Sequence, residues 1–225
     1  MNEYYLNITV VPRGKSMIVT KAAVMAGCSG GTVIGGRGIS RNGLAVLLGF
    51  GEFDQDIIIN LVEKDRRREV QTAIKVSCSS QKKFFGGMFS LKAQDFVKGG
   101  NIYHGETKMN LENSEESKDK MTHELIVVIV NKDFADDVMH AARKAGAGGG
   151  TVINARGTAR EEDAKFFGVQ IVPEKEMLMI LVDSDKKEKV LESIRNLKCI
   201  SQPGSGIAFT LPATDFTVLG KSAGK

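Results

Sequence analysis

The residues best suited to bind a ligand are arginines followed by glycine at two distant places in the chain. Each place has a second arginine four residues later, and the four are Arg37, Arg41, Arg156 and Arg160. The glycines directly after the first arginine of each pair are Gly38 and Gly157. A guanidinium group binds phosphate or carboxylate through two parallel hydrogen bonds. We therefore predict that both places bind a small anionic effector, although solvated charges at the base of a loop are an equal alternative.

Two glycine-rich turns could add backbone N–H donors, because successive N–H groups in such a turn form an anion-binding concavity. The residues are Gly86 and Gly87, with Lys82 and Lys83 just before them, and Gly204, Ser205 and Gly206. The two lysines could supply positive charge for a phosphate. The alternative is that they are an ordinary surface pair.

Two nucleotide-binding motifs do not fit. Residues 13–16 read Arg-Gly-Lys-Ser like the tail of a P-loop, but that motif requires glycine where Thr9 stands. The glycines within residues 146–150 follow a helical pattern and precede a strand pattern, the reverse of a dinucleotide fingerprint. We interpret them as a helix end and a tight turn.

Catalysis and metal binding have little support. The acidic run 161–163 is solvated, whereas acid–base catalysis needs carboxyl groups with shifted pKa values. The three cysteines are Cys28, Cys78 and Cys199, too far apart for a disulfide framework or a metal site. The histidines His104, His123 and His140 do not recur in the internal repeat described next. We expect that the protein is not an enzyme, that it binds no metal and that it resides in a reducing compartment.

The chain contains an internal repeat. Residues 31–38 and 150–157 share Gly-Thr-Val-Ile-x-x-Arg-Gly at an offset of 119 residues, and one inserted residue later makes the offset 120. An internal repeat of this length determines the domain count. We predict a first domain at 1–100, a polar linker at 101–122 and a second domain at 123–225.

The composition narrows the class of protein. Residues 1–100 hold 14 basic and 8 acidic residues, which hints at an anionic partner, although solubility is the commoner reason for so small an excess. The N-terminus lacks a basic start followed by an apolar run, and no apolar stretch approaches the ~20 residues of a membrane span. We expect a soluble, cytoplasmic protein that does not insert into membranes.

Both repeats predict the order β-α-β-β-α-β, an α+β fold of the ferredoxin-like type with two helices on one face of an antiparallel sheet. The predicted elements are strands 4–11, 32–34, 57–62 and 88–91 with helices from Ser16 and Asp65, then strands 125–130, 151–155, 177–182 and 207–211 with helices 134–145 and 185–197. Asp65 and the Asp185 and Glu188 pair are predicted caps, and Arg66, Arg67 and Arg68 are predicted to face outward. The uncovered sheet faces predict oligomerisation.

The connection between the second and third strands of each repeat is long, at residues 35–56 and 156–173. A hairpin needs only a short turn, and long connections without periodicity are usually functional or disordered. Aromatic residues stand within both, at Phe50, Phe53, Phe166 and Phe167. We expect them to anchor the connection or to insert into a partner.

The order and spacing of these motifs resemble the PII signal-transduction family, in a divergent PII-like branch. The resemblance covers nearly all of both repeats and predicts two tandem PII-like domains. It implies a homotrimeric regulator, acting in nitrogen regulation, that binds a small anionic effector, with an adenine nucleotide as one candidate. The long connection corresponds to the family's T-loop, which contacts a target transporter or enzyme.

The chain departs from the family pattern at the turn before the last strand. The family has a lysine where Gly87 and Ile207 stand, and paired arginines where Val218 and Gly220 lie. Two rivals therefore remain. One is an effector-independent trimeric scaffold, and the other is a nucleic-acid binder, which would need aromatic and basic residues on the open sheet face where the strands are aliphatic.

Overall fold

The computed structural model describes residues 3–39, 52–93, 122–157, 165–166, 169–170, 174–201 and 206–221. Four of the predicted site residues lie outside these ranges, namely Arg41, Arg160, Gly204 and Ser205. Residues 101–121 of the predicted linker also lie outside them.

The first half of the chain, here residues 3–93, forms four strands and two helices. They are β1 (Tyr4–Pro12), α1 (Ser16–Met25), β2 (Thr32–Ile39), β3 (Glu52–Glu63), α3 (Lys64–Cys78) and β4 (Gly86–Ala93). The strands pair antiparallel in the order β4-β1-β3-β2. The element order is the predicted β-α-β-β-α-β.

The second half, here residues 122–221, has the same principal order with additional short elements. It comprises β5 (His123–Asn131), α4 (Ala135–Lys144), β6 (Gly150–Arg156), β7 (Lys165–Phe166), β8 (Val169–Gln170), β9 (Glu174–Asp183), the 3₁₀ helix η1 (Ser184–Lys186), α5 (Lys187–Arg195), α6 (Lys198–Ser201) and β10 (Gly206–Leu219). The principal strands pair antiparallel in the order β10-β5-β9-β6. This half fits the ferredoxin-like fold.

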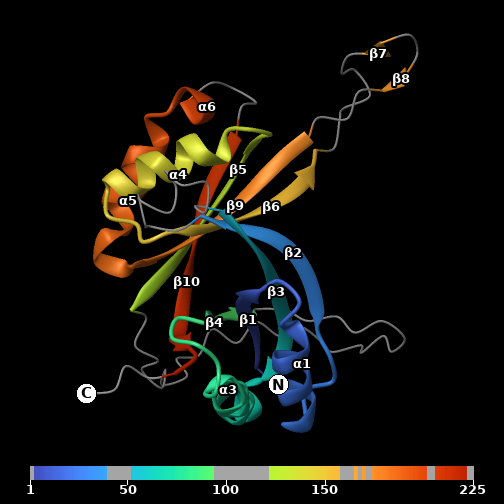
Figure 1. Cartoon of the computed structure of the whole chain (residues 1–225). Coiled ribbons are helices and arrows are strands. Elements are labelled where there is room, and N and C mark those ends of the chain that lie inside the picture. Colours follow the sequence, from blue (N-terminus) through green and yellow to red (C-terminus); the bar gives the residue numbers. More distant parts are fainter. Residues whose placement is uncertain are drawn as a thin grey trace, which may run out of the picture.

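The two sheets join into one closed barrel of the eight principal strands (Figure 1). At one seam β2 pairs with β6, from Arg37 opposite Val152 to Ile39 opposite Gly150. At the other, the 14-residue strand β10 pairs first with β5 and then, beyond a register shift, with β4. Asp215 has a φ of 56° at that shift, a left-handed conformation that suits a bulge.

Hydrophobic side chains fill three regions. One lies inside the barrel, where Ile8, Ile57 and Phe89 of the first half meet Leu125 and Val127 of the second. The other two lie between each sheet and its helices. The two halves therefore cover each other's inner faces. Oligomerisation is not needed for that purpose, and the predicted trimer stays a prediction.

Helix α4 illustrates how the sequence determines the packing. Its buried residues Ala135, Val138, Met139 and Ala142 have the i, i+3, i+4, i+7 spacing of one helix face. They contact a cluster that also contains Ile39 from the other half of the chain. Burial of Ile39 ties β2 to the second half beyond the strand pairing itself.

Several local predictions were wrong. Helix α3 begins at Lys64, so Asp65 lies within its first turn, and neither α3 nor η1 has a side-chain capping bond at its N-cap residue. Arg67 is buried rather than outward-facing. In the part of the chain that the structure describes, no helix is both long and apolar enough to cross a membrane.

Candidate functional site at the bases of the long connections

Each long connection joins two strands of one sheet, and the predicted arginines lie where the strands end. Arg37 and Gly38 are inside β2, which continues to Ile39, and not in a loop as predicted. Arg156 is the last residue of β6, directly opposite Glu174 at the start of β9, and Gly157 follows it. The described strands extend further than predicted, and β7 and β8 form a small ladder within the second connection.

Arg37 is held by two carboxylates of the second half. Its Nη1 lies 3.1 Å from Oδ1 of Asp136 in α4, and its Nη2 lies 3.3 Å from Oε1 of Glu176 in β9. The Glu176 side chain is only 6% exposed, and that of Arg37 is 23% exposed. The geometry makes Arg37 a structural tie between the halves, since its predicted role in binding an anion would compete with these contacts.

Glu176 also holds the start of helix α4. Its Oε2 accepts hydrogen bonds from the backbone N–H groups of Asp133 and Ala135, both at 3.1 Å. The first N–H groups of a helix have no partner within the helix, so a carboxylate there stabilises it. One buried side chain thus satisfies the end of a helix and an arginine from the other half.

The first half repeats this cap with Asp56 of β3, at an offset of 120 from Glu176. Its Oδ2 accepts from the N–H groups of Gly14 at 2.9 Å and Ser16 at 3.3 Å, at the start of α1. Here the paired cation comes from the same half, because Nε of Arg13 lies 3.5 Å from the Asp56 carboxylate. Neither carboxylate is among the site residues predicted from the sequence. The signal available in the sequence was that an acidic residue directly precedes the third predicted strand of each repeat, with Asp56 before 57–62 and Glu176 before 177–182.

The base of the second connection carries an exposed basic cluster, defined here as Arg156, Lys132 and Lys175. Arg156 lies opposite Glu174, and the neighbouring pair in the ladder is Ala155 with Lys175. Lys132 donates a hydrogen bond to Glu174, which raises the pKa of the lysine. Nζ of Lys175 lies 2.5 Å from Oδ1 of Asn131.

Arg156 differs from Arg37 in its surroundings. It is exposed, and it forms no ion pair with the residues that the structure describes. Lys132 is paired with Glu174, whereas no carboxylate of the described residues contacts the Arg156 guanidinium, so this cation remains available to attract an anion. This is the described place where the predicted anion chemistry and an accessible guanidinium coincide.

The glycines Gly86 and Gly87 lie inside β4 instead of in a turn. A Cβ on Gly86 would stand 2.2 Å from the carbonyl oxygen of Val10, so the close approach of β1 requires glycine. A Cβ on Gly87 would meet only the Phe216 ring, at 3.4 Å. Both glycines serve strand packing, and their predicted contribution to an anion-binding turn is not supported by this position.

The backbone before β4 is hydrogen-bonded to the end of β10. The N–H of Phe85 donates to the carbonyl of Leu219, and the N–H of Lys221 donates to that of Gln81. The carbonyl of Lys82 lies 2.1 Å from where a Cβ on Gly220 would be, whereas the side chains of Lys82 and Lys83 are exposed. Nζ of Lys83 lies 5.2 Å from the centre of the Phe84 ring.

Gly206 opens β10 opposite Val130. A Cβ there would lie 2.8 Å from the carbonyl oxygen of Ile129, again a close approach between strands. Its predicted neighbours Gly204 and Ser205 lie outside the described residues.

The thiols occupy packed positions. Cys28 and Cys78 are buried and Cys199 is half-buried. Burial raises the pKa of the Cys78 and Cys199 thiols. Within the described ranges no three His, Cys, Asp or Glu side chains are grouped so as to hold a metal ion.

Comparison with known proteins gives one match. No curated protein matches the chain. The family model described as nitrogen regulatory protein P-II matches residues 123–222. These residues include β5 to β10 and the exposed basic cluster. The match supports membership of the second half of the chain in the PII superfamily.

Proposed function

We propose that this chain is a PII-like regulatory protein whose second half binds a small anionic effector at the exposed basic cluster. One observation carries the proposal: Arg156 is exposed at the base of a long connection, within the segment that matches the P-II family. An anion bound between Arg156 and Lys132 would compete with Glu174 and change the local charge. Such a change at the base of a connection can order or release it and so alter contact with a target protein.

The two halves have different tasks in this proposal. Arg37 is engaged by Glu176 and Asp136, so the base of the first connection is fixed to the second half. The basic cluster of the second half has no such tie to the first half among the described residues. We therefore propose that the second half senses the effector. The effectors proposed for it include adenine nucleotides. We also propose that the protein is a cytoplasmic homotrimer, that its target is a transporter or an enzyme, and that it acts in nitrogen regulation.

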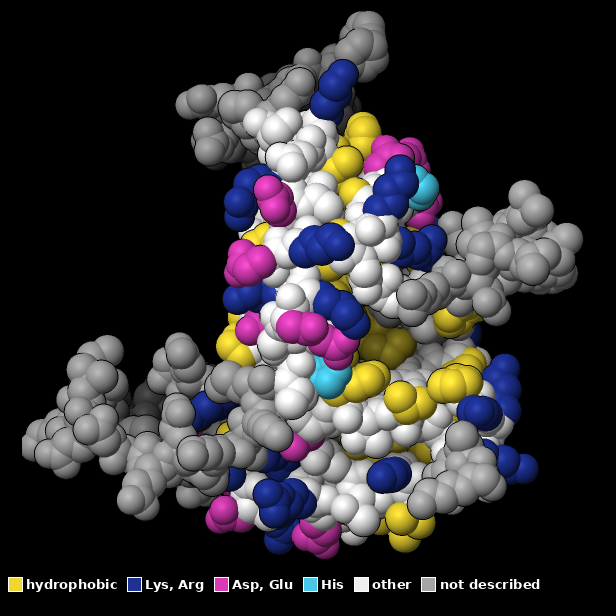
Figure 2. All heavy atoms as spheres, turned by 90° about the vertical axis from the view of Figure 1, so that its left-hand side faces the viewer, with side chains coloured by type: hydrophobic (Ala, Val, Ile, Leu, Met, Phe, Trp, Pro, Cys, Tyr) yellow, Lys and Arg dark blue, Asp and Glu magenta, His cyan; other side chains and the backbone are white. Residues whose placement is uncertain are grey.

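A trimeric or other scaffold that binds no effector is the second candidate. It is favoured because Arg37 is paired within the chain and because Gly86 and Gly87 lie in a strand instead of an anion-binding turn. A nucleic-acid binder is less well supported. On the face shown in Figure 2, basic and acidic side chains are interspersed instead of forming a basic stripe.

The test is a thermal-shift screen of the purified chain with ATP, ADP, AMP, cyclic nucleotides, bicarbonate and 2-oxoglutarate. A ligand that binds the folded state raises the melting temperature by mass action. We expect Arg156→Ala and Lys132→Ala to abolish the shift without lowering the melting temperature of the free protein. Arg195→Ala, which removes an exposed arginine in α5, is the matched control and should leave the shift intact.

Arg37→Ala separates the two tasks. It should lower the melting temperature of the free protein, because it removes a partner of buried Glu176, while the ligand-induced shift persists. If no anion shifts the folded protein, the scaffold replaces the effector-binding proposal. If the shift depends on Arg37 and not on Arg156, sensing belongs to the first connection.

A further inference from the structure

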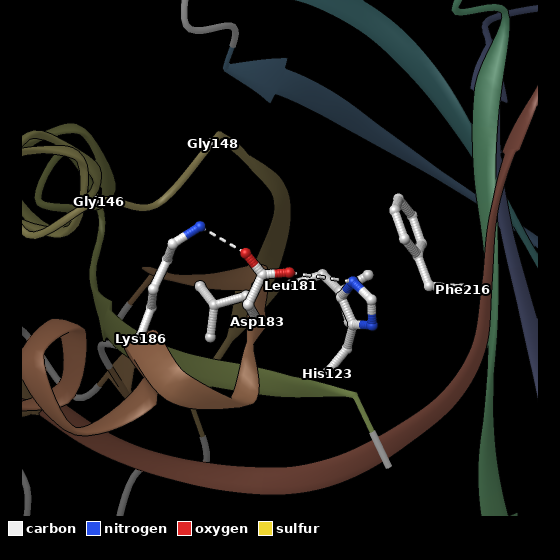
Figure 3. A pocket seen from close by; sticks show the side chains of 8 residues that line it. His123, Gly146, Gly148, Leu181, Asp183, Lys186 and Phe216 are labelled. Atoms are coloured by element: carbon white, nitrogen blue, oxygen red, sulfur yellow. Dashed lines mark hydrogen bonds and ion pairs between the residues drawn. The ribbon is translucent and has the colours of Figure 1, made fainter. Parts of the chain in front are cut away.

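A separate pocket lies at the opposite end of the second-half sheet from the basic cluster. It has a volume of about 330 Å³ and is lined by His123, Gly146, Gly148, Leu181, Val182, Asp183, Lys186 and Phe216 (Figure 3). Arg156 pairs with Glu174 at the start of β9, whereas Asp183 is the last residue of that strand. Small-ligand pockets begin at roughly 300 Å³, so this one admits a molecule of few heavy atoms.

The polar side of the pocket carries opposite charges in contact. The Asp183 carboxylate accepts a hydrogen bond from Lys186 through one oxygen, and its other oxygen lies 3.3 Å from Nε2 of His123. Thr122 Oγ1 lies 2.8 Å from the other ring nitrogen of His123. In Figure 3 the Asp183 carboxylate lies between Lys186 and His123. A ligand with only a negative charge would be repelled by Asp183 here, and a ligand with only a positive charge would be repelled by Lys186.

The other side is apolar and aromatic. The rings of His123 and Phe216 are 4.9 Å apart and tilted by 52°, with Leu181 and Val182 also lining the pocket. Phe216 belongs to the part of β10 that pairs with β4, so the pocket, whose lining residues all belong to the second half, lies beside the junction with the first half. Figure 2 shows hydrophobic side chains gathered around a hollow at mid-height of the molecule.

Glycines keep the remaining side open. A Cβ on Gly148 would have no atom within 4 Å, and one on Gly146 would have only Cδ of Lys186, at 3.8 Å. Gly146 has a φ of 108°, which favours glycine. The turn between α4 and β6 therefore leaves space beside Lys186.

The first half has the same set of positions, but there they are filled. Tyr4, Glu63, Arg66 and Gly27 align with His123, Asp183, Lys186 and Gly146 at offsets of 119 and 120. The Tyr4 hydroxyl donates to Glu63 at 3.3 Å, as His123 contacts Asp183. Nη1 of Arg66 lies only 1.9 Å from where a Cβ on Gly27 would be. The longer arginine closes the space that Lys186 leaves open.

We propose that the pocket of the second half binds a free α-amino acid with an apolar side chain. The ligand ammonium group contacts Asp183, the ligand carboxylate contacts Lys186, and its side chain packs on Phe216 and Leu181. A zwitterion gives each member of the Asp183–Lys186 pair a new partner of opposite charge. This site is independent of the basic cluster and of the anionic effector proposed there.

The direct test is isothermal titration calorimetry of the full chain with L-leucine and L-phenylalanine at neutral pH. Two analogues of leucine isolate each charge: 4-methylpentanoate lacks the ammonium group, and isopentylamine lacks the carboxylate. We expect both amino acids to bind and each analogue to bind at least about tenfold more weakly.

Variants assign the two charges. Asp183→Asn should weaken leucine binding and reduce its advantage over 4-methylpentanoate, because the repulsion between two carboxylates is removed. Lys186→Met should also weaken leucine binding and reduce its advantage over isopentylamine, because the repulsion between two ammonium groups is removed. The exposed neighbours provide matched controls, and Asp185→Asn and Lys189→Gln should leave all affinities unchanged. Arg156→Ala should also leave them unchanged, which separates this proposal from the proposed effector site.

A measurement on the unmodified chain covers the case of a variant that does not fold. Intermolecular nuclear Overhauser effects between the leucine methyl groups and the Phe216 ring are expected if the side chain packs as proposed. The proposal is overturned if the folded chain binds neither amino acid at millimolar concentration. It is equally overturned if binding persists with unchanged preference in both charge variants, or if the contacts map away from Phe216.

Discussion

Arg37 of β2 and Glu176 of β9 form an ion pair between the two halves of the chain, with Nη2 and Oε1 3.3 Å apart. The same carboxylate caps helix α4 through the N–H groups of Asp133 and Ala135. Strand position, helix start and the junction of the halves therefore depend on one buried side chain.

Glu176→Ala should reduce the free energy of unfolding by about 3 kcal/mol, because it leaves a partly buried arginine without this partner and two helix N–H groups without an acceptor. Urea denaturation followed by circular dichroism measures the change. Glu174→Ala is the matched control on the same strand, where the carboxylate is exposed, and its effect should be much smaller. Equal losses for the two variants would contradict the role assigned to Glu176.

Replacement by alanine should change the stability of the fold to different extents at the adjacent glycines Gly86 and Gly87. Gly86→Ala places a Cβ against the Val10 carbonyl oxygen, and backbone cannot yield as a side chain can, so we expect a loss of about 2 kcal/mol or more. Gly87→Ala meets only an ordinary contact with Phe216 and should change stability by less than about 1 kcal/mol. Thermal unfolding of the two variants side by side is the measurement, and a destabilised Gly87→Ala would argue against the packing described.

Much of the second-half fold could be predicted from local pattern. The helix predicted at 134–145 is α4 at Ala135–Lys144, because its apolar residues share one face and Gly146 ends it. The strand predicted at 177–182 lies inside β9, where buried and half-buried residues alternate. These signals are local, so the rest of the chain was not required to interpret them.

What could not be predicted depends on contacts between the halves. Strand β10 was expected to end near Leu211, yet it continues to Leu219 because its last part pairs with β4. Arg67 was expected to face solvent as one of three consecutive arginines, but it lies over the Tyr5 ring at 4.0 Å and contacts Asp215 of β10. No periodicity within residues 66–68 reports a partner almost 150 residues away.

Asp215→Asn tests that contact. Nε of Arg67 lies 3.2 Å from Oδ2 of Asp215, and the Arg67 side chain is only 5% exposed. Asparagine tolerates the left-handed backbone at this position, so the substitution removes the charge and little else. We expect a loss of about 1 to 3 kcal/mol in unfolding free energy. The control Asp185→Asn, at an exposed position, should leave stability within about 0.5 kcal/mol, and an equally small effect at Asp215 would disprove the tie.

The Asp183–Lys186 pair predicts a pH dependence. The hydrogen bond from Lys186 holds the pKa of Asp183 below its ordinary value. A carboxyl group whose pKa is lower in the folded state stabilises the fold above the unfolded-state pKa, and this contribution is lost as the pH falls through the folded-state pKa. The pair is half exposed, so the effect on stability is small.

Carboxyl-detected NMR titration measures this directly. The midpoint of Asp183 should lie on the acid side of the ordinary aspartate value, and Lys186→Met should raise it. A midpoint that does not move in Lys186→Met would show that the lysine does not hold the carboxylate in solution.

The path of β10 has a consequence for the order in which the protein is made. Strand β4 is synthesised well before the partner that pairs with it, because residues 214–219 of β10 follow it by more than 100 residues in the sequence. Phe89 and Leu91 therefore lack part of their final cover until the second half has been synthesised. Closing a contact between such distant segments is slow, and exposed strand edges aggregate in the meantime. A chain terminated before residue 206 would keep its first-half sheet permanently open, so nascent and truncated products are the forms of this protein that most require chaperones.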